Sequence, residues 1–223
     1  MNLVQLFEKL YFKKEFSELF DILQNNEDEK SLYVIGKIYF EQGDLDKAIK
    51  FFEKSKAYFE VAKCKFLKKD LYGTKHFLNK LKEETVASNW LSFLVDVVEN
   101  RVKKYPTFFQ VRNFLEVDLS LLFEVNNIEY AEKIINCSYF VDANAEANKF
   151  FARVLYNYEY VSLSQIFLDK SLDIFYKDPE THFIKAQCFL KENNIEEAKK
   201  HLNYCLEYAD NYFPARKLLK ELN

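Results

Sequence analysis

Apolar residues recur along the chain at spacings of three and four, and short polar turns separate the apolar stretches. The clearest stretch, residues 35–55 (IGKIYFEQGDLDKAIKFFEKS), aligns without gaps with residues 151–171 (FARVLYNYEYVSLSQIFLDKS). In both copies the helical pattern stops at a polar turn and resumes after it. The pattern predicts an all-α chain of antiparallel helix pairs that repeat along the sequence.

A usually small position in the first helix marks each repeat. Five copies, spaced by 26, 57, 33 and 34 residues, place there Gly36, Ala62, Leu119, Ala152 and Ala186. Twelve residues later every copy is small again, with Ala48, Thr74, Ala131, Ser164 and Ala198. Eight residues past the marker, four copies carry good N-caps for a second helix: Asp44, Asp70, Asn127 and Asn194. Two helices that approach closely at small residues explain these columns better than a generic bundle with chance similarity.

The spacing is irregular in two places. The step of 26 residues requires helices that follow one another almost without a turn, and the step of 57 is too long by about one helix pair. Within the long step, the apolar periodicity predicts a helix over 87–105 that Pro106 ends. We expect Trp90, in this helix, to be a core residue. We expect one array of six to seven repeats, with N-terminal repeats over 1–84, an irregular helical insert over 85–114, and further repeats with a capping helix over 115–223.

Composition and charge exclude several classes of function. The chain has 3 Gly and 3 Pro but 23 Phe and 15 Tyr, so Gly-rich phosphate and dinucleotide loops are not expected. Its net charge of -3 draws it to neither nucleic acid nor an anionic membrane. It shows no signal peptide pattern and no run of 18 apolar residues. The four cysteines lack C-x-x-C spacing, and we expect buried free thiols in the cytoplasm or nucleus.

Chemistry-bearing constellations are nearly empty. The three histidines are dispersed in the sequence, and neither H-E-x-x-H nor G-x-S-x-G occurs. Paired carboxylates such as Glu83-Glu84 and Glu196-Glu197 fall at expected helix starts or ends, where we expect them to be solvated or, at a start, to favour the helix dipole. We therefore expect no catalytic residues, no metal, no cofactor and no small-molecule substrate.

The repeat resembles the tetratricopeptide repeat, which has a period of 34 residues. The match is best at Leu32, Ile35, Gly36, Tyr39, Gly43, Leu45, Ala48 and Phe52, and good at Ala186, Phe189, Ala198 and Leu202. The resemblance implies a superhelical solenoid whose first helices line a concave groove, mainly through positions three before, one after and four after the marker. Those positions give an aromatic groove with basic neighbours: Tyr33, Lys37, Phe40, Phe59, Lys63, Phe66, Phe123, Arg153, Tyr156 and Phe183.

The groove suits an amphipathic helix of a partner, although some of its aromatics are expected only to pack against neighbouring helices. Related co-chaperones clamp acidic tails with asparagines one past the marker, and this chain has none there. The N-terminal helix offers a candidate occupant, because it carries an apolar stripe with no polar cap: Leu3, Leu6, Phe7, Leu10 and the adjoining Tyr11. We expect a homodimer in which this helix enters the partner's groove.

A narrower resemblance is to the tetratricopeptide subunits of the anaphase-promoting complex. It is carried by residues 152–164 (ARVLYNYEYVSLS), by Asp178-Pro179-Glu180 and by residues 186–189 (AQCF). It implies a structural subunit of a large ubiquitin-ligase assembly in cell-cycle control that dimerises through its N-terminal repeats. The chain departs from those subunits in lacking their long disordered insert and in having fewer repeats. The alternative is a monomeric peptide-binding adaptor or co-chaperone of another pathway.

One basic stretch leaves a third alternative open. Residues 63–82 hold seven lysines and His76 against a single acid, Asp70, with Phe66, Tyr72 and Phe77 between them. Such a stretch can contact phosphate backbones. Charges on the outer face of a solenoid are common, however, and Glu83 and Glu84 follow directly. The sequence alone does not favour nucleic acid as a partner.

Overall fold

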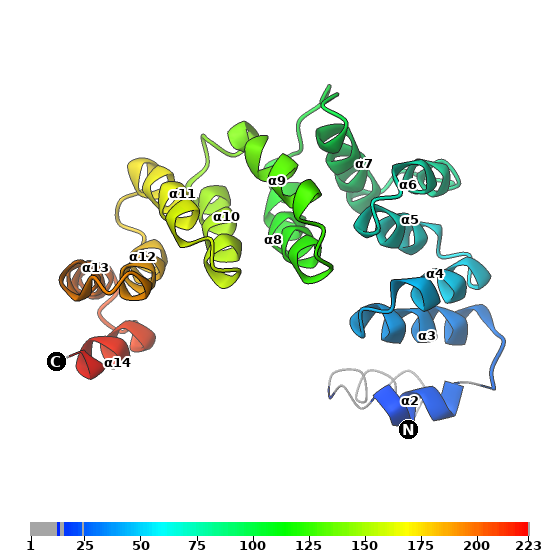
Figure 1. Cartoon of the computed structure of the whole chain (residues 1–223), viewed down its shortest axis with the longest axis horizontal. Coiled ribbons are helices and arrows are strands. Elements are labelled where there is room, and N and C mark those ends of the chain that lie inside the picture. Colours follow the sequence, from blue (N-terminus) through cyan, green and yellow to red (C-terminus); the bar gives the residue numbers. More distant parts are fainter. Residues whose placement is uncertain (1–12, 14–15, 24, 223) are drawn as a thin grey trace. The chain divides into compact units, whose positions relative to one another are not determined.

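The computed structural model describes residues 13, 16–23 and 25–222. These residues form thirteen α-helices and one short 3-10 helix, with no strand among them (Figure 1). The helices are α2 (Phe16–Leu23), α3 (Glu29–Glu41), α4 (Leu45–Lys54), α5 (Tyr58–Leu67), α6 (Leu71–Leu78), α7 (Val86–Val98), α8 (Phe108–Glu124), α9 (Ile128–Asn136), η1 (Ser138–Phe140), α10 (Ala145–Asn157), α11 (Val161–Ile174), α12 (Pro179–Lys191), α13 (Ile195–Tyr208) and α14 (Phe213–Glu221). The expected all-α fold class is confirmed.

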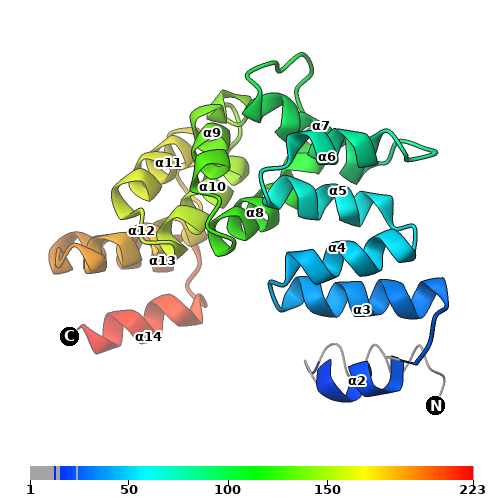
Figure 2. The ribbon, with the colours of Figure 1, turned by 45° about the vertical axis from the view of Figure 1, so that its right-hand side comes forward.

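Two compact units divide the chain, unit 1 over 1–95 and unit 2 over 96–223. The division falls inside α7, and so inside the stretch expected to be an insert. In unit 1, α3 pairs with α4 and α5 with α6, while α4 packs on α5 (Figure 2). In unit 2 the pairs are α8 with α9, α10 with α11 and α12 with α13, and α14 packs on α13. These five pairs are the five predicted copies of the repeat.

Close helix contact occurs at the predicted small positions. In the first helices, Ala62, Ala152 and Ala186 have no exposed surface. The small residues of all five second helices have none either: Ala48, Thr74, Ala131, Ser164 and Ala198. At Gly36 a Cβ would lie 2.7 Å from the Phe52 ring, so this copy has room for glycine only unless the ring moves. The Ser164 hydroxyl donates a hydrogen bond of 2.7 Å to the Ala152 carbonyl and so joins α11 to α10. The small columns are therefore the packing seams of the pairs.

Seven turns in the described part of the chain have the same backbone geometry. A residue with left-handed φ is followed by an N–H that bonds to the carbonyl five residues earlier, which closes the end of the preceding helix. The left-handed residues are Gly43, Lys56, Lys69, Asn100, Asn126, Glu159 and Asn193, and the closing bonds measure 2.7–2.9 Å. The turn at Lys56 joins α4 to α5 through residues 55–57 alone. This short connection explains how the step of 26 residues between two markers is accommodated.

The predicted N-caps of the second helices are confirmed. The side chains of Asp44, Asp70, Asn127 and Asn194 each accept a hydrogen bond from the backbone N–H three residues later. The remaining second helix is α11. Its N-cap residue, Tyr160, makes no side-chain capping bond. The caps and the left-handed residues together let the chain reverse with very little glycine.

Helix α7 is shorter than predicted. The apolar pattern favours a helix over 87–105, but α7 ends at Val98 because Asn100 adopts φ 55 and the Arg101 N–H bonds to the Asp96 carbonyl at 2.8 Å. Pro106 therefore precedes the next helix instead of ending this one, and α8 starts from a capping box made by Thr107 and Gln110. Trp90 is 1% exposed, which confirms it as a core residue.

All four cysteines are free, and three of them are buried. Burial raises the pKa of Cys64 to about 12 and that of Cys205 to about 11, so both thiols stay protonated near neutral pH. Within the described part of the chain, no helix has the length and apolar character needed to cross a membrane.

Candidate functional site

Ion pairs join the first helices of unit 2 to one another. The Arg153 guanidinium of α10 lies 3.4 Å from Glu116 Oε1 of α8 and 3.0 Å from Glu180 Oε1 of α12. The Lys149 ammonium, one turn earlier on α10, lies 2.8 Å from Asp178 Oδ2 and 2.9 Å from Glu180 Oε2. We call these five residues the ion-pair ladder. It spans three consecutive first helices.

The charges of the ladder are held in place. Burial by itself would lower the pKa of Lys149, but the hydrogen bonds to Asp178 and Glu180 outweigh burial and raise the pKa. Burial would likewise raise the pKa of Asp178, whereas its hydrogen bonds from Lys149 and Thr181 lower the pKa. Both residues are therefore charged near neutral pH. Only 12% of the Lys149 side chain and 15% of the Asp178 side chain is exposed, so solvent screens this pair less than a surface pair.

Two half-buried aromatic residues lie one helical turn from the ladder, Tyr156 three residues after Arg153 and Phe183 three residues after Glu180. The Tyr156 ring lies under the Lys191 ammonium, 4.1 Å from the nitrogen. The Phe183 ring lies 5.3 Å from that of Tyr212, at the start of α14. We call Tyr156, Phe183 and the ladder the unit 2 face. It combines ordered charges with aromatic surface that remains partly open.

Unit 1 has a smaller counterpart between α3 and α5. The Tyr33 hydroxyl donates a hydrogen bond of 3.1 Å to Glu60 Oε1, and the Lys37 ammonium lies 3.7 Å from the same oxygen. Burial, followed by the charge and hydrogen bond of Glu60, raises the pKa of Tyr33 to about 12, so the hydroxyl remains a donor. The Lys37 ammonium also lies 5.8 Å from the centre of the Phe40 ring.

The ten predicted groove residues divide by burial. Phe66 and Phe123 are 2% and 8% exposed and belong to the core, where Phe123 stacks on Tyr158 at 4.7 Å. The other eight are half-buried: Tyr33, Lys37, Phe40, Phe59, Lys63, Arg153, Tyr156 and Phe183. Five of these eight lie in unit 1 and three in unit 2. The predicted dimer residues Leu3, Leu6, Phe7, Leu10 and Tyr11 lie outside the described residues.

Two of the histidines, dispersed in the sequence, meet in the fold. The Nδ1 atoms of His182 and His201 lie 2.9 Å apart, and His182 Nε2 lies 2.8 Å from the Tyr176 carbonyl oxygen. Because a carbonyl only accepts, His182 Nε2 carries the proton and His201 Nδ1 donates to His182 Nδ1. Burial lowers the pKa of His182 and lowers that of His201 to about 4. The pair is neutral near pH 7. The 19 residues between the two histidines correspond to the step from the first to the second helix of one pair, and this spacing is the signal that sequence reasoning missed.

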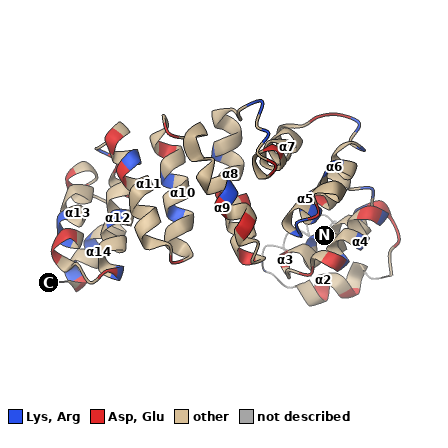
Figure 3. Cartoon of the chain, turned by 45° about the horizontal axis from the view of Figure 1, so that its top comes forward, with Lys and Arg blue, Asp and Glu red and all other residues tan. Residues whose placement is uncertain are grey.

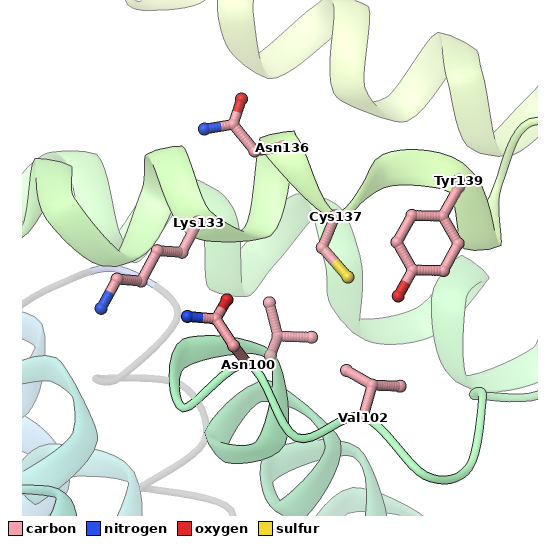
Figure 4. Close-up of a pocket in the computed structure, with 7 residues that line it drawn as sticks. Asn100, Val102, Lys133, Asn136, Cys137 and Tyr139 are labelled. Carbon is pink, nitrogen blue, oxygen red and sulfur yellow. The ribbon is translucent and has the colours of Figure 1, made fainter.

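A cavity of about 400 Å³ lies in unit 2 between the end of α9 and the loop after α7 (Figure 4). It is lined by Val97, Asn100, Val102, Lys133, Asn136, Cys137 and Tyr139. The Lys133 ammonium is already engaged, because it donates to the Val98 carbonyl at 3.2 Å and lies 3.3 Å from Glu129. Among the described residues, no group of three or more His, Cys, Asp or Glu side chains is placed to hold a metal ion.

Two segments match the tetratricopeptide repeat: residues 29–58, which contain α3 and α4, and residues 179–212, which contain α12 and α13. No curated protein matches the chain. Among solved structures, the chain is similar to YrrB, described as a TPR protein with an unusual peptide-binding site, at 14% identity over 92% of this chain and 97% of that one, with a TM-score of 0.37.

A second similar structure is the anaphase-promoting-complex hetero-tetramer Cut9-Hcn1, at 15% identity and a TM-score of 0.42; the match covers 99% of this chain but 48% of that one. A third is Acl4, an assembly chaperone of RpL4, at 13% identity over 99% and 94% of the two chains, with a TM-score of 0.39. The fold assignment rests on the chain's own repeats. With two matched segments and three further helix pairs of the same construction, the chain is an all-α protein built from tetratricopeptide repeats.

Proposed function

We propose that the chain is a non-catalytic protein-interaction scaffold and that the unit 2 face binds a helical segment of a partner protein. The observation that carries this proposal is the ion-pair ladder. Its charges are ordered before any partner arrives, so a partner that contacts them does not have to immobilise them. The neighbouring Tyr156 and Phe183 offer aromatic surface of the kind that contributes most to protein interfaces.

The chemistry of the face suggests which kind of helix it binds. The ladder contains three carboxylates and two cations, so it keeps one uncompensated negative charge. A partner helix with an apolar stripe for the aromatic rings and a basic residue beside it would complement this arrangement. A strongly acidic segment would be repelled. The proposal therefore distinguishes the face from a clamp for acidic tails.

Affinity capture from the source cell, with mass-spectrometric identification of the captured proteins, tests the proposal. Arg153→Glu inverts the charge at the centre of the ladder, and Phe183→Ala removes an aromatic contact of about 1–3 kcal/mol. We expect each variant to reduce recovery of the same partner about tenfold. Lys217→Glu, which changes an exposed lysine of α14, is the matched control. Unchanged capture by both variants, with circular dichroism showing intact helices, would exclude the unit 2 face.

The sequence resemblance supports a narrower proposal. Under this narrower proposal, the chain is a structural subunit of the anaphase-promoting complex and is most like the scaffold subunit cell-division-cycle twenty-seven. It works in the cytoplasm or nucleus and forms a homodimer through its N-terminal helix. Sedimentation analysis tests the dimer, since Leu6→Asp with Phe7→Asp should convert it to a monomer. A wild type that is already monomeric favours a peptide-binding adaptor instead, and capture without other ubiquitin-ligase subunits contradicts the assignment to that complex.

A further inference from the structure

The surface of α4, α5 and α6 is strongly and unevenly charged. Over residues 45–84 the exposed charged side chains are eight lysines and four acids, which are Lys47, Lys50, Lys54, Lys56, Lys68, Lys69, Lys80, Lys82, Asp46, Glu53, Glu83 and Glu84. Basic residues lie in α5 and at the start of the loop after α6, and the same loop continues with acidic residues (Figure 3). The whole chain has a net charge of only -3. This surface is therefore a local feature that the overall charge conceals.

An open aromatic ring lies among these lysines. Tyr72, in the first turn of α6, is 84% exposed, more than any other large apolar or aromatic side chain in the described part of the chain. His76 lies one turn further along the same helix face and is also exposed. A core-packing role does not account for a ring with this exposure. Its flat faces are open to a planar partner.

The turn before Tyr72 has a closed backbone and carries two exposed lysines, Lys68 and Lys69. Lys69 has φ 64, and the Asp70 N–H closes the turn with a bond of 2.9 Å to the Lys65 carbonyl. Asp70 is occupied within the protein, because its carboxylate accepts from the Gly73 N–H at 2.8 Å and lies 3.1 Å from the Lys65 ammonium. Lys68 forms a surface ion pair with Asp46. Such exposed pairs contribute about 0–1 kcal/mol, so a phosphate can compete for Lys68.

We propose that single-stranded nucleic acid binds the α6 surface, which consists of Lys68, Lys69, Tyr72, Lys80 and Lys82. In this proposal Lys68 and Lys69 contact phosphates, and Tyr72 stacks on a base. Lys80 and Lys82, beyond the other end of α6, contact further phosphates of the same strand. Helix α6 has eight residues and is about 12 Å long, so both ends fall within the reach of one short strand. Single-stranded nucleic acid is bound in this way, by cations that track the backbone and aromatic rings on which bases stack.

The exposed ring decides between anionic partners. An acidic protein segment would use the lysines but would leave Tyr72 without a role. An anionic membrane would favour several exposed apolar side chains beside the lysines, and the α6 surface carries one open ring. Duplex nucleic acid keeps its bases stacked on one another and does not present them to a tyrosine. An unpaired strand uses both features of the surface.

Fluorescence anisotropy of the full chain with a fluorescein-labelled 20-nucleotide oligouridine tests the proposal, at 50 and 200 mM KCl. Four phosphate contacts predict a loss of affinity of about 50-fold between these salt concentrations. Tyr72→Ala should weaken binding about 5- to 50-fold without changing the salt dependence, because stacking is uncharged. Lys68→Gln with Lys69→Gln should weaken binding and reduce the logarithmic salt slope by about 1.4.

Lys217→Gln with Lys220→Gln removes two exposed lysines of α14 and is the matched control, with binding expected to be unchanged. Circular dichroism of each variant verifies the fold. Oligouridine binding weaker than about 1 mM at 50 mM KCl would overturn the proposal. So would equally tight binding of polyglutamate or phosphatidylserine vesicles, or full retention of affinity by Tyr72→Ala. None of these outcomes bears on the unit 2 face, whose test uses other residues and another partner.

Discussion

At the scale of single residues, the pair His182 and His201 shows how the fold changes the chemistry of its side chains. In solution each imidazole gains a proton near pH 6.5. Here the rings are buried among Tyr176, Tyr204 and Tyr208 and share a hydrogen bond between their Nδ1 atoms. Burial lowers the pKa of His182, and the Lys185 charge adds to this effect. Together they outweigh the Tyr176 carbonyl, Asp178 and Glu207, which favour the protonated form.

The pair predicts acid sensitivity of the fold. Since the pKa of both histidines is lower in the folded chain, the unfolded chain binds more protons below about pH 6.5. Their contribution to stability is complete above that pH and declines as pH falls toward the folded pKa of His201, about 4. The decline amounts to about 3 kcal/mol. Urea titrations between pH 7.5 and 4.5 measure it.

His201→Gln should flatten this pH dependence, because it removes the group with the lower pKa and keeps a donor for His182. His76→Gln, at an exposed histidine, should leave the profile as in the wild type. A His201→Gln chain with the complete wild-type slope would show that carboxylates elsewhere cause the acid sensitivity.

At the scale of elements, the left-handed turns define the array. Seven helix ends close in the same way, but only one of the seven left-handed residues, Gly43, is a glycine. A left-handed φ costs an ordinary L-residue roughly 1–2 kcal/mol, and Asn tolerates it best. Lys56, Lys69 and Glu159 therefore carry backbone strain that the packing of the helix pairs offsets. Asn100, Asn126 and Asn193 carry less.

Gly43 provides a direct measure of this strain. Its φ is 75, and a Cβ there would meet no atom within 4 Å, so a substitution acts through the backbone alone. Gly43→Ala should lower the free energy of unfolding by about 1 kcal/mol, and Gly43→Asn should lower it by less. Chemical denaturation of the three chains measures both differences. Equal losses for Ala and Asn would contradict the backbone explanation.

At the scale of the whole molecule, two surfaces with different chemistry lie in different compact units. The α6 surface belongs to unit 1 and carries an excess of lysines, whereas the unit 2 face has an internally paired ladder and half-buried rings. The two share no residue, so substitutions in them should act independently.

Independence is testable with one panel of variants. Arg153→Glu should reduce capture of the protein partner and leave oligouridine affinity within about twofold of the wild type. Tyr72→Ala should show the reverse. In the double variant each binding free energy should change by as much as in the corresponding single variant. Loss of both activities in either single variant would indicate that the two sites are coupled.

The helix pairs of this protein are predictable from its sequence alone, because they depend on local patterns. Small residues such as Ala152 and Ser164 marked the packing seams, and Asp44 and Asn194 marked the starts of second helices. Sequence position within the repeat also brought Arg153, Tyr156 and Phe183 together as candidates for one face. These inferences needed only the repeat register and the geometry of an α-helix.

Tertiary structure decided what depends on burial and on contacts between repeats. It placed Phe66 and Phe123 in the core, because the exposure of an aromatic ring depends on neighbouring helices that a single repeat does not contain. It joined His182 to His201 and tied Arg153 to two other helices. It also left Tyr72 exposed beside lysines such as Lys68, whose partner Asp46 lies at the surface. The sequence shows how many charged and aromatic side chains the protein has. Only the folded structure determines which of them contact each other and which are exposed to solvent.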